Sequence, residues 1–216
     1  MGKVIAIDGP AGAGKGTLAK ELAKRLGFVN IDTGATYRCV ALQVLRDGLS
    51  LDDVDKIIDI SSNIKIDLLE DGTVLLNDED VTKEIRSKEV TNIVSQISSI
   101  VKVRENLVNV QRNIAADKDV VMEGRDITTV VFPDAQYKFY LDASIDERAR
   151  RRFEECKEKG IDMSYEEIYN NIKERDYNDM HKEVGALMRT DDQIYIDCTN
   201  LSVNEEVNII MDKINK

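Results

Sequence analysis

The sequence has little of what membrane-spanning, disulfide-rich and metal-binding proteins require. Its 216 residues include three cysteines, one histidine, two prolines and no tryptophan. No apolar run approaches the ~20 residues that cross a bilayer, so a transmembrane span is excluded. The cysteines lie far apart and are odd in number, which excludes a disulfide framework and a close-spaced zinc motif. A single histidine argues against a histidine-rich metal site and a Ser-His-Asp triad.

Acidic residues outnumber basic ones by 41 to 30, which gives a net charge of −11. Broad binding to DNA or RNA needs a basic face, so we expect no nucleic-acid partner, although local arginines can still bind a small anion. The first apolar stretch stops at Asp8 and does not form a secretory signal. We therefore expect a cytoplasmic monomer with no membrane partner, and the chain length suits one domain with insertions.

Short apolar segments alternate with amphipathic ones along the chain. Segments rich in Val and Ile, typical of strands buried on both faces, lie at 3–7, 28–31, 119–123, 137–141 and 193–197. Helical patterns lie at 17–26, 35–69 with a loop near Gly48, 84–116 as one or two helices, 142–159 and 203–214. Another helix is expected after Ser164, which forms a capping-box pattern with Glu167. This alternation predicts a three-layer α/β fold with a central five-stranded parallel sheet.

The segment 64–81 has a different pattern. Ile64, Ile66 and Leu68 alternate with polar residues, and an Asp71-Gly72 pair separates them from a second apolar run at 74–76. An Asp-Gly pair between apolar runs is a strong hairpin signal. The segment therefore predicts a small antiparallel sheet inserted in the fold.

A glycine-rich loop follows the first expected strand and precedes the first expected helix. Backbone N–H groups in such a loop form a nest for anions, and the helix dipole adds positive potential there. Lys15 can reach the β- and γ-phosphates of a nucleotide, and glycines let the backbone approach them. We therefore predict that ATP binds at Gly9, Pro10, Ala11, Gly12, Ala13, Gly14, Lys15, Gly16 and Thr17.

The end of this loop departs from the usual Gly-Lys-Ser/Thr pattern, because Gly16 precedes Thr17. Direct contact of the Thr17 hydroxyl with Mg²⁺ and contact through water are both open. The chain has no Asn-Lys-x-Asp guanine motif and no Leu-Ser-Gly-Gly transport motif. Its Gly-Lys-Gly-Thr form resembles nucleoside monophosphate kinases.

Three further segments, at 32–38, 123–126 and 174–179, place arginine beside acid. With them the chain resembles the bacterial cytidylate kinases nearly end to end. The resemblance runs through IAIDGPAGAGKGTLA, IDTGATYR, VSQISSIVKVRE, EGRD before TVVFPDA, LDAS-x-x-ERA-x-RR, IKERD and DCTNLS. It implies one P-loop kinase domain over 1–216, with an acceptor-binding insertion at about 33–105 and a helical lid at about 146–186.

The same resemblance implies roles for individual residues. Arg38 and Arg125 match arginines that bind the acceptor monophosphate, and Asp179 matches an acid that faces the ribose. The implied CMP-binding residues are Thr33, Arg38, Ser95, Arg104, Arg125, Asp126, Arg175, Asp179 and Lys182, of which Ser95, Arg104 and Asp126 match positions that contact cytosine. The implied lid arginines are Arg148, Arg151 and Arg152, and the implied catalytic residues are Lys15, Arg125, Arg148 and Arg152.

The chain also departs from the family pattern. Lys182 stands where arginine is usual, which removes a bidentate phosphate contact. Glu123 replaces an aspartate, Thr128 replaces a glycine and Ala186 replaces a proline. The segment 188–192 is unfamiliar. These departures concern lid closure and the purine side more than the reaction.

The resemblance implies transfer of the γ-phosphoryl group of ATP to CMP or dCMP, with Mg²⁺ bound to ATP. No direct protein ligand to the metal is expected; Asp8 or Glu123 would organise its water molecules, or would only hydrogen-bond the loop. The lid arginines could instead form a solvated helix face, and Arg125 with Asp126 a structural ion pair. A kinase for UMP or AMP, and a non-catalytic ATP-binding module, are the alternative functions.

Overall fold

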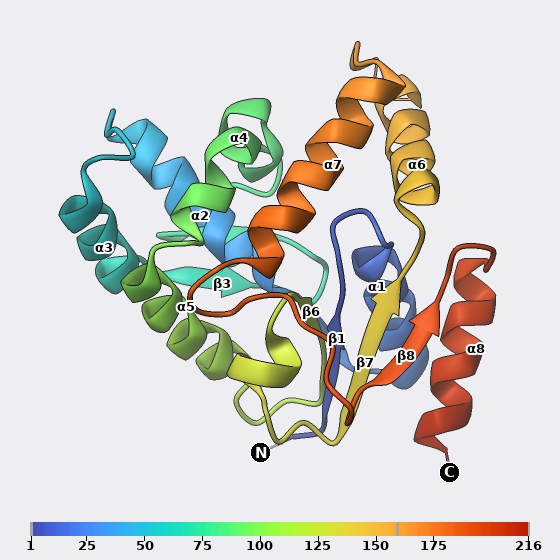
Figure 1. The fold of residues 1–216 in the computed structure, drawn as a ribbon. Helices are drawn as coiled ribbons and strands as arrows, with labels where there is room; N and C mark the ends of the chain where they lie inside the picture. The colour runs from blue at the N-terminus through green and yellow to red at the C-terminus, as the bar shows by residue number, and fades with distance from the viewer. Residues whose placement is uncertain (1, 159, 216) are drawn as a thin grey trace.

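Five parallel strands form the central sheet (Figure 1). The computed structural model describes residues 2–158 and 160–215, and its sheet has the order β2-β6-β1-β7-β8. Every pairing in this sheet is parallel. The prediction of the sheet is confirmed, with each strand bound within one residue of the expected one. The strands are β1 (Val4–Asp8), β2 (Val29–Asp32), β6 (Val120–Gly124), β7 (Tyr137–Asp142) and β8 (Ile194–Asp197).

Helices cover both faces of the sheet, which makes the expected three layers. Along β1, Val4 and Ala6 belong to one hydrophobic core, whereas Ile5 and Ile7 belong to the other. Because successive side chains of a strand point to opposite faces, an apolar run of this kind requires cover on both sides. The first core contains α2 (Thr33–Arg46) and α5 (Val101–Ile114), and the second contains α1 (Lys15–Leu26) and α8 (Val203–Ile214).

A small antiparallel sheet interrupts the chain between β2 and β6, as the hairpin pattern predicts. The turn forms at Asp71-Gly72, where Gly72 has φ 91° and Leu69 and Thr73 pair across the turn. The sheet has a third strand that was not predicted. The helical pattern over 35–69 with a loop near Gly48 is confirmed as two helices on either side of Gly48, and only its end is wrong, because residues 66–68 pair in the sheet. The elements are α3 (Val54–Asn63), β3 (Ile66–Leu68), β4 (Val74–Leu76) and β5 (Glu79–Asp80).

The expected helical region at 84–116 consists of a short 3₁₀ turn, η1 (Glu84–Arg86), followed by α4 (Lys88–Ile97) and α5. The side chain of Ser87 accepts a hydrogen bond from the backbone of Val90 and caps α4. In the described part of the chain, no helix combines the length and apolar character needed to cross a membrane.

Two helices in the C-terminal half of the chain lie side by side beyond the carboxyl ends of the strands (Figure 1). They are α6 (Ile145–Glu158) and α7 (Tyr165–Met180). A small core of Ala149, Cys156, Ile168 and Ile172 lies between them, separate from the two cores of the sheet. The expected helix over 142–159 begins at Ile145 instead, and Lys159 lies outside the described residues. This hairpin lies within the span, about 146–186, for which the sequence implies a helical lid, and its action as a lid stays a prediction.

An unpredicted π-helical turn, η2 (Ile127–Val131), follows β6. Asp8, at the end of β1, accepts hydrogen bonds from the backbone N–H groups of Ile127 and Thr128, at 2.8 and 2.9 Å, and from the Thr128 hydroxyl at 2.6 Å. The buried Gln193 amide donates in turn to that hydroxyl. Thr128, where a glycine was expected, thus links β1 to the segment before β8.

We expect Ser164→Ala to lower the free energy of unfolding by about 1 kcal/mol. Ser164 caps α7 and forms the predicted capping box with Glu167, so the variant leaves the backbone N–H of Glu167 without its side-chain partner. Urea unfolding of wild type, Ser164→Ala and the cap-preserving Ser164→Asp measures the effect. An alanine variant as stable as the wild type would show that the cap contributes nothing here.

Candidate active site

The glycine-rich loop lies between β1 and α1, at the carboxyl end of the central strand. Gly9 approaches the backbone of Leu141 on β7 so closely that a Cβ would lie 2.0 Å from the Leu141 carbonyl oxygen. Gly14 precedes α1 in a left-handed conformation, with φ 95°. Both positions therefore require glycine. The loop wraps the N-terminus of α1, where the helix dipole and free N–H groups attract an anion.

Lys15 is the first residue of α1 and its side chain is buried under the loop. Its Nζ atom donates to the carbonyl oxygen of Pro10 at 2.8 Å, and the residue is 5% exposed. Burial and the nearby charge of Arg125 lower the pKa of Lys15. Burial raises the pKa of Glu123, the acid that faces the same space. A bound polyanion would reverse the first shift, because negative charge stabilises the ammonium form.

Further cations from three other parts of the fold act on the same space. Burial lowers the pKa of Arg38 on α2, and the positive charges of Arg152 and Arg125 lower it further. Burial and Arg125 lower the pKa of Arg175 on α7 to about 10. A cation whose pKa is lowered by neighbouring cations lies among like charges, and Asp32 and Asp179 offset this effect only in part. An anion that entered would relieve the repulsion, as a phosphate does.

Asp179 anchors part of this cluster from α7. Its two carboxylate oxygens accept from Arg125 Nε and from Lys182 Nζ, each at 2.8 Å. Although burial raises it, these charges hold the pKa of Asp179 well below its usual range. Lys182 also donates to the hydroxyl of Ser98 at 2.9 Å. Lys182, which stands where the family usually has arginine, is thus fixed between α7 and the end of α4.

The residues implied for cytosine contact lie at the other side of the cluster. Arg104 donates to Asp126 at 2.6 Å, and their side chains are only 3% and 5% exposed. The guanidinium of Arg104 also lies over the ring of Tyr37, at 5.0 Å from its centre. Gly185, with φ 68°, covers the pair so closely that a Cβ would lie 2.4 Å from an Asp126 oxygen. A base can therefore reach Asp126 only if the segment around Gly185 shifts.

The arginines of α6 are placed differently from one another. Arg148 is buried and donates to Asp176 at 2.6 Å and to the loop carbonyl of Ala11 at 2.9 Å. Arg151 donates to the carbonyl of Cys198 at 2.8 Å. Arg152 is exposed and pairs with Glu155. The first two hold α6 against the phosphate loop, which the sequence pattern did not indicate.

The carboxyl groups considered for the metal have different surroundings. Both oxygens of Asp8 are occupied by η2, so this group hydrogen-bonds a neighbouring segment. Glu123 instead has an oxygen 3.3 Å from where a Cβ on Gly16 would lie, and Thr17 beside it is exposed. No group of three His, Cys, Asp or Glu side chains that could hold a metal occurs within residues 2–158 and 160–215.

Comparisons with known proteins bear on the whole chain. The family described as cytidylate kinase matches residues 5–216. A cytidylate kinase of Caldanaerobacter subterraneus is 51% identical over 213 residues, which are 98% of this chain and 94% of that protein. One of Fusobacterium nucleatum is 45% identical, over 99% and 97%.

The chain belongs to the cytidylate kinase family. Membership in this family supports the activity of a nucleoside monophosphate kinase. Among solved structures, a shikimate kinase of Bacteroides thetaiotaomicron has a TM-score of 0.51 at 14% identity, with 99% of each chain covered. An uncharacterised protein of Eubacterium ventriosum has a TM-score of 0.54 at 13% identity, again over 99% of each. These two likenesses concern the fold, which is that of P-loop kinases.

The structure brings most of the implied family residues to one edge of the sheet. Thr33 donates to the carbonyl of Glu123 at 2.8 Å, which joins the start of α2 to the end of β6. Ser95 is half-buried on α4. Tyr37 and Asp176 were not among the site residues predicted from the sequence. The ring of Tyr37 packs against the guanidinium of Arg104, and Asp176 forms an ion pair with Arg148. Their motifs, IDTGATYR and ERD, were recognised, but which arginine each contacts depends on elements distant in the chain.

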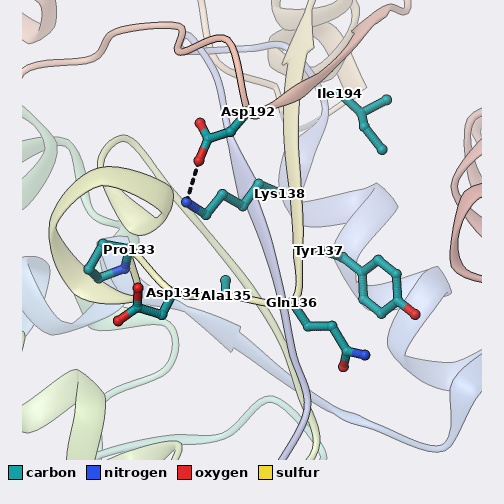
Figure 2. Close-up of a pocket in the computed structure, with 8 residues that line it drawn as sticks. All are labelled: Pro133, Asp134, Ala135, Gln136, Tyr137, Lys138, Asp192 and Ile194. Carbon is teal, nitrogen blue, oxygen red and sulfur yellow. Dashed lines mark hydrogen bonds and ion pairs between the residues drawn. The ribbon is translucent and has the colours of Figure 1, made fainter.

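A separate pocket of about 410 Å³ lies at the opposite end of β7 (Figure 2). Tyr137 and Lys138, which line it, begin the strand, whereas the phosphate loop follows the carboxyl end of β1. Lys138 is already paired with Asp192 there. The pocket therefore does not belong to the cationic site.

We expect the protein to take up protons at Lys15 when a polyphosphate binds at pH 8. The lowered pKa leaves Lys15 partly neutral in the free protein, and the ligand's negative charge restores its proton. Calorimetry of tripolyphosphate binding in two buffers of different ionisation enthalpy measures the uptake. Uptake should fall toward zero at pH 6, where Lys15 is already charged, and most of it should disappear in Lys15→Met. Equal uptake by that variant would assign the protons to another group.

Proposed function

We propose that the protein transfers the γ-phosphoryl group of ATP to the phosphate of CMP or dCMP, which gives ADP and CDP or dCDP. The observation that carries this proposal is the crowding of Lys15, Arg38, Arg125 and Arg175 around one space beside a phosphate loop. Crowded cations in a chain of net charge −11 are costly unless anions occupy the site. Membership in the cytidylate kinase family supports this donor and acceptor.

The chemical task in such a reaction is electrostatic. The acceptor phosphate is already ionised near pH 7, so no general base is needed. Two polyanions must instead be held in line against their repulsion. Lys15 lies where it can bind the donor's phosphates, while Arg38, Arg125 and Arg175 approach from the acceptor side. Charges fixed in advance lower the barrier without reorganisation during the reaction.

The residues present fit Mg²⁺ carried by ATP. Glu123 places carboxylate oxygen beside the open end of the loop, and Thr17 is exposed next to it. Oxygen ligands and retained water are what Mg²⁺ prefers, so Glu123 and Thr17 would hold its water molecules. The metal supplies charge neutralisation between the phosphates when bound. Asp8 is already committed to η2 and would not take part.

The α6–α7 hairpin would close over the phosphates and exclude water. Arg152 already exerts its charge on Arg38, although its guanidinium pairs with Glu155. We propose that closure turns Arg152 toward the transferring group. Arg148 and Arg151 would keep α6 attached to the loop, as their contacts with its carbonyl groups suggest.

We also propose that the protein acts in the cytoplasm as a monomer on free nucleotides. Its three cysteines are buried free thiols. Free thiols are the usual state of cysteine in a reducing compartment.

The central test is ATP-dependent phosphorylation of a panel of CMP, dCMP, UMP, AMP and GMP. We expect turnover with CMP and dCMP, and a loss of at least ~10²-fold in Lys15→Met, because one preorganised charge at the phosphoryl group contributes that much. Thermal melting checks that the variant folds. Binding of ATP without any acceptor turnover would indicate a nucleotide-binding module, and a preference for UMP or AMP another kinase.

A second test concerns the choice of base. Cytosine has an exocyclic amine where uracil has a carbonyl, so Asp126 as an acceptor suits cytosine alone. We expect kcat/KM to favour CMP over UMP by at least ~10-fold. The double variant Ser95→Ala/Arg104→Met should lose most of this preference.

A matched variant is needed because Arg104→Met leaves Asp126 buried without its ion pair, which can unfold the protein. Ser95→Ala alone spares the pair and should reduce the preference in part. An unchanged preference in a folded double variant would refute the assignment of cytosine contacts.

A further inference from the structure

A buried carboxyl group lies behind the phosphate loop, where the proposed reaction does not use it. Glu206 is in the first turn of α8, between that helix and the sheet, and is 2% exposed. Its Oε2 atom has no hydrogen-bond partner among the residues that the structure describes. An unpaired polar atom of this kind costs stability, so its retention calls for an explanation.

The thiol of Cys198 connects this carboxyl group to the loop. Its Sγ atom donates to the carbonyl oxygen of Ala13 at 3.2 Å, and the same thiol is a hydrogen-bond neighbour of the Glu206 carboxyl. Burial and the charge of Glu206 raise the pKa of Cys198 to about 11, so the thiol keeps its proton at neutral pH. One proton therefore serves two possible acceptors, Ala13 and Glu206.

Arg151 is the other charged group that acts on Glu206. Its guanidinium contacts the carbonyl oxygens of Cys198, at 2.8 Å, and of Ala13, at 3.4 Å. Arg25 of α1, which packs on α8, is instead engaged by Asn204 and Asn208. The donors at the Ala13 carbonyl are thus the two groups, Cys198 and Arg151, that an ionised Glu206 would attract.

We propose that Glu206 is a positioning residue of the phosphate loop, whose protonation decides whether Cys198 donates to Ala13 or to Glu206. A neutral Glu206 leaves the thiol proton to the Ala13 carbonyl and thereby fixes the peptide between Ala13 and Gly14. An ionised Glu206 is the stronger acceptor, so the thiol donates its hydrogen bond to the carboxylate instead of to Ala13. The negative charge of Glu206 also attracts Arg151. The loop then loses preorganisation for the phosphates.

The change in the hydrogen-bond acceptor of Cys198 falls within the physiological pH range. Burial raises the pKa of Glu206 to about 7. We expect the dissociation constant for ATP to rise about threefold as the pH increases through this value, since the loss is one weak thiol hydrogen bond. This readout rests on the proposed function, so the first experiment uses the protein without any nucleotide.

Infrared difference spectroscopy of the ligand-free protein tests directly which group accepts the hydrogen bond of the Cys198 thiol. Subtraction of the Cys198→Ala spectrum isolates the S–H stretching band of this thiol from those of Cys39 and Cys156. The band should move to lower frequency as the pH rises through 7, because a carboxylate is a stronger acceptor than a peptide carbonyl. It should stay fixed in Glu206→Gln. A fixed band in the wild type would overturn the proposal, whatever the protein binds.

Calorimetric titration of ATP between pH 5.5 and 8.5 tests the consequence for the loop. The ratio of wild-type to Glu206→Gln dissociation constants cancels the ionisation of ATP itself and should show the threefold step. Asp212→Asn, which removes an exposed acid from the same helix, should retain the step. Cys198→Ala should abolish it. A ratio of wild-type to Glu206→Gln constants that does not change with pH, or a step of full size in Cys198→Ala, would refute the role of Glu206.

Unfolding measured against pH gives a control that does not depend on nucleotides. Because the pKa of Glu206 is raised on folding, its stabilising contribution is full below its unfolded value and is lost as the pH rises through about 7. Glu206→Gln should remove this slope. If wild type shows the slope and the infrared shift but no ATP binding, the proposed function fails and the positioning of the loop does not. If ATP binds and is used but neither pH effect is found, the reverse holds.

Discussion

Repulsion between like charges at the carboxyl edge of the sheet is the constraint on which the rest of this structure depends. Lys15, Arg38, Arg125 and Arg175 face one space. Burial lowers the pKa values of the other three, and the charge of Arg125 lowers them further, which records the cost of that crowding. The site tolerates this cost because neighbouring carboxylates are buried beside it. Asp179 holds Arg125 and Lys182 together, so the cations are fixed in position before any phosphate arrives.

Buried ion pairs also join the helices around the site to one another and to neighbouring segments. Arg148 of α6 contacts Asp176 of α7 and the phosphate loop, and Arg104 of α5 contacts Asp126 after β6. Each pair spans elements far apart in the sequence. Because removing one partner of such a pair leaves an uncompensated buried charge, these contacts fix the relative positions of the elements that they join.

One departure from the family pattern has a structural reason. Thr128 uses the hydroxyl that glycine lacks to join Asp8 to Gln193, and so ties β1 to the segment before β8. Gly185 has a left-handed conformation that brings backbone against Arg104 and Asp126. The segment after α7 therefore covers Arg104 and Asp126, the candidate base contacts.

The sequence by itself determined the parallel sheet, the phosphate loop and the family, because each depends on a local pattern: short runs rich in Val and Ile, glycines before a helix, and motifs in a fixed order. It also predicted α8 and the capping box of α7 at their observed residues. Tertiary structure alone decided which charge meets which. Arg125 pairs with Asp179 of α7, whereas its neighbour Asp126 pairs with Arg104 of α5, because the chain turns after β6 and places the two adjacent side chains against different elements. Likewise, only the packing of α8 under the loop placed Glu206 beside Cys198.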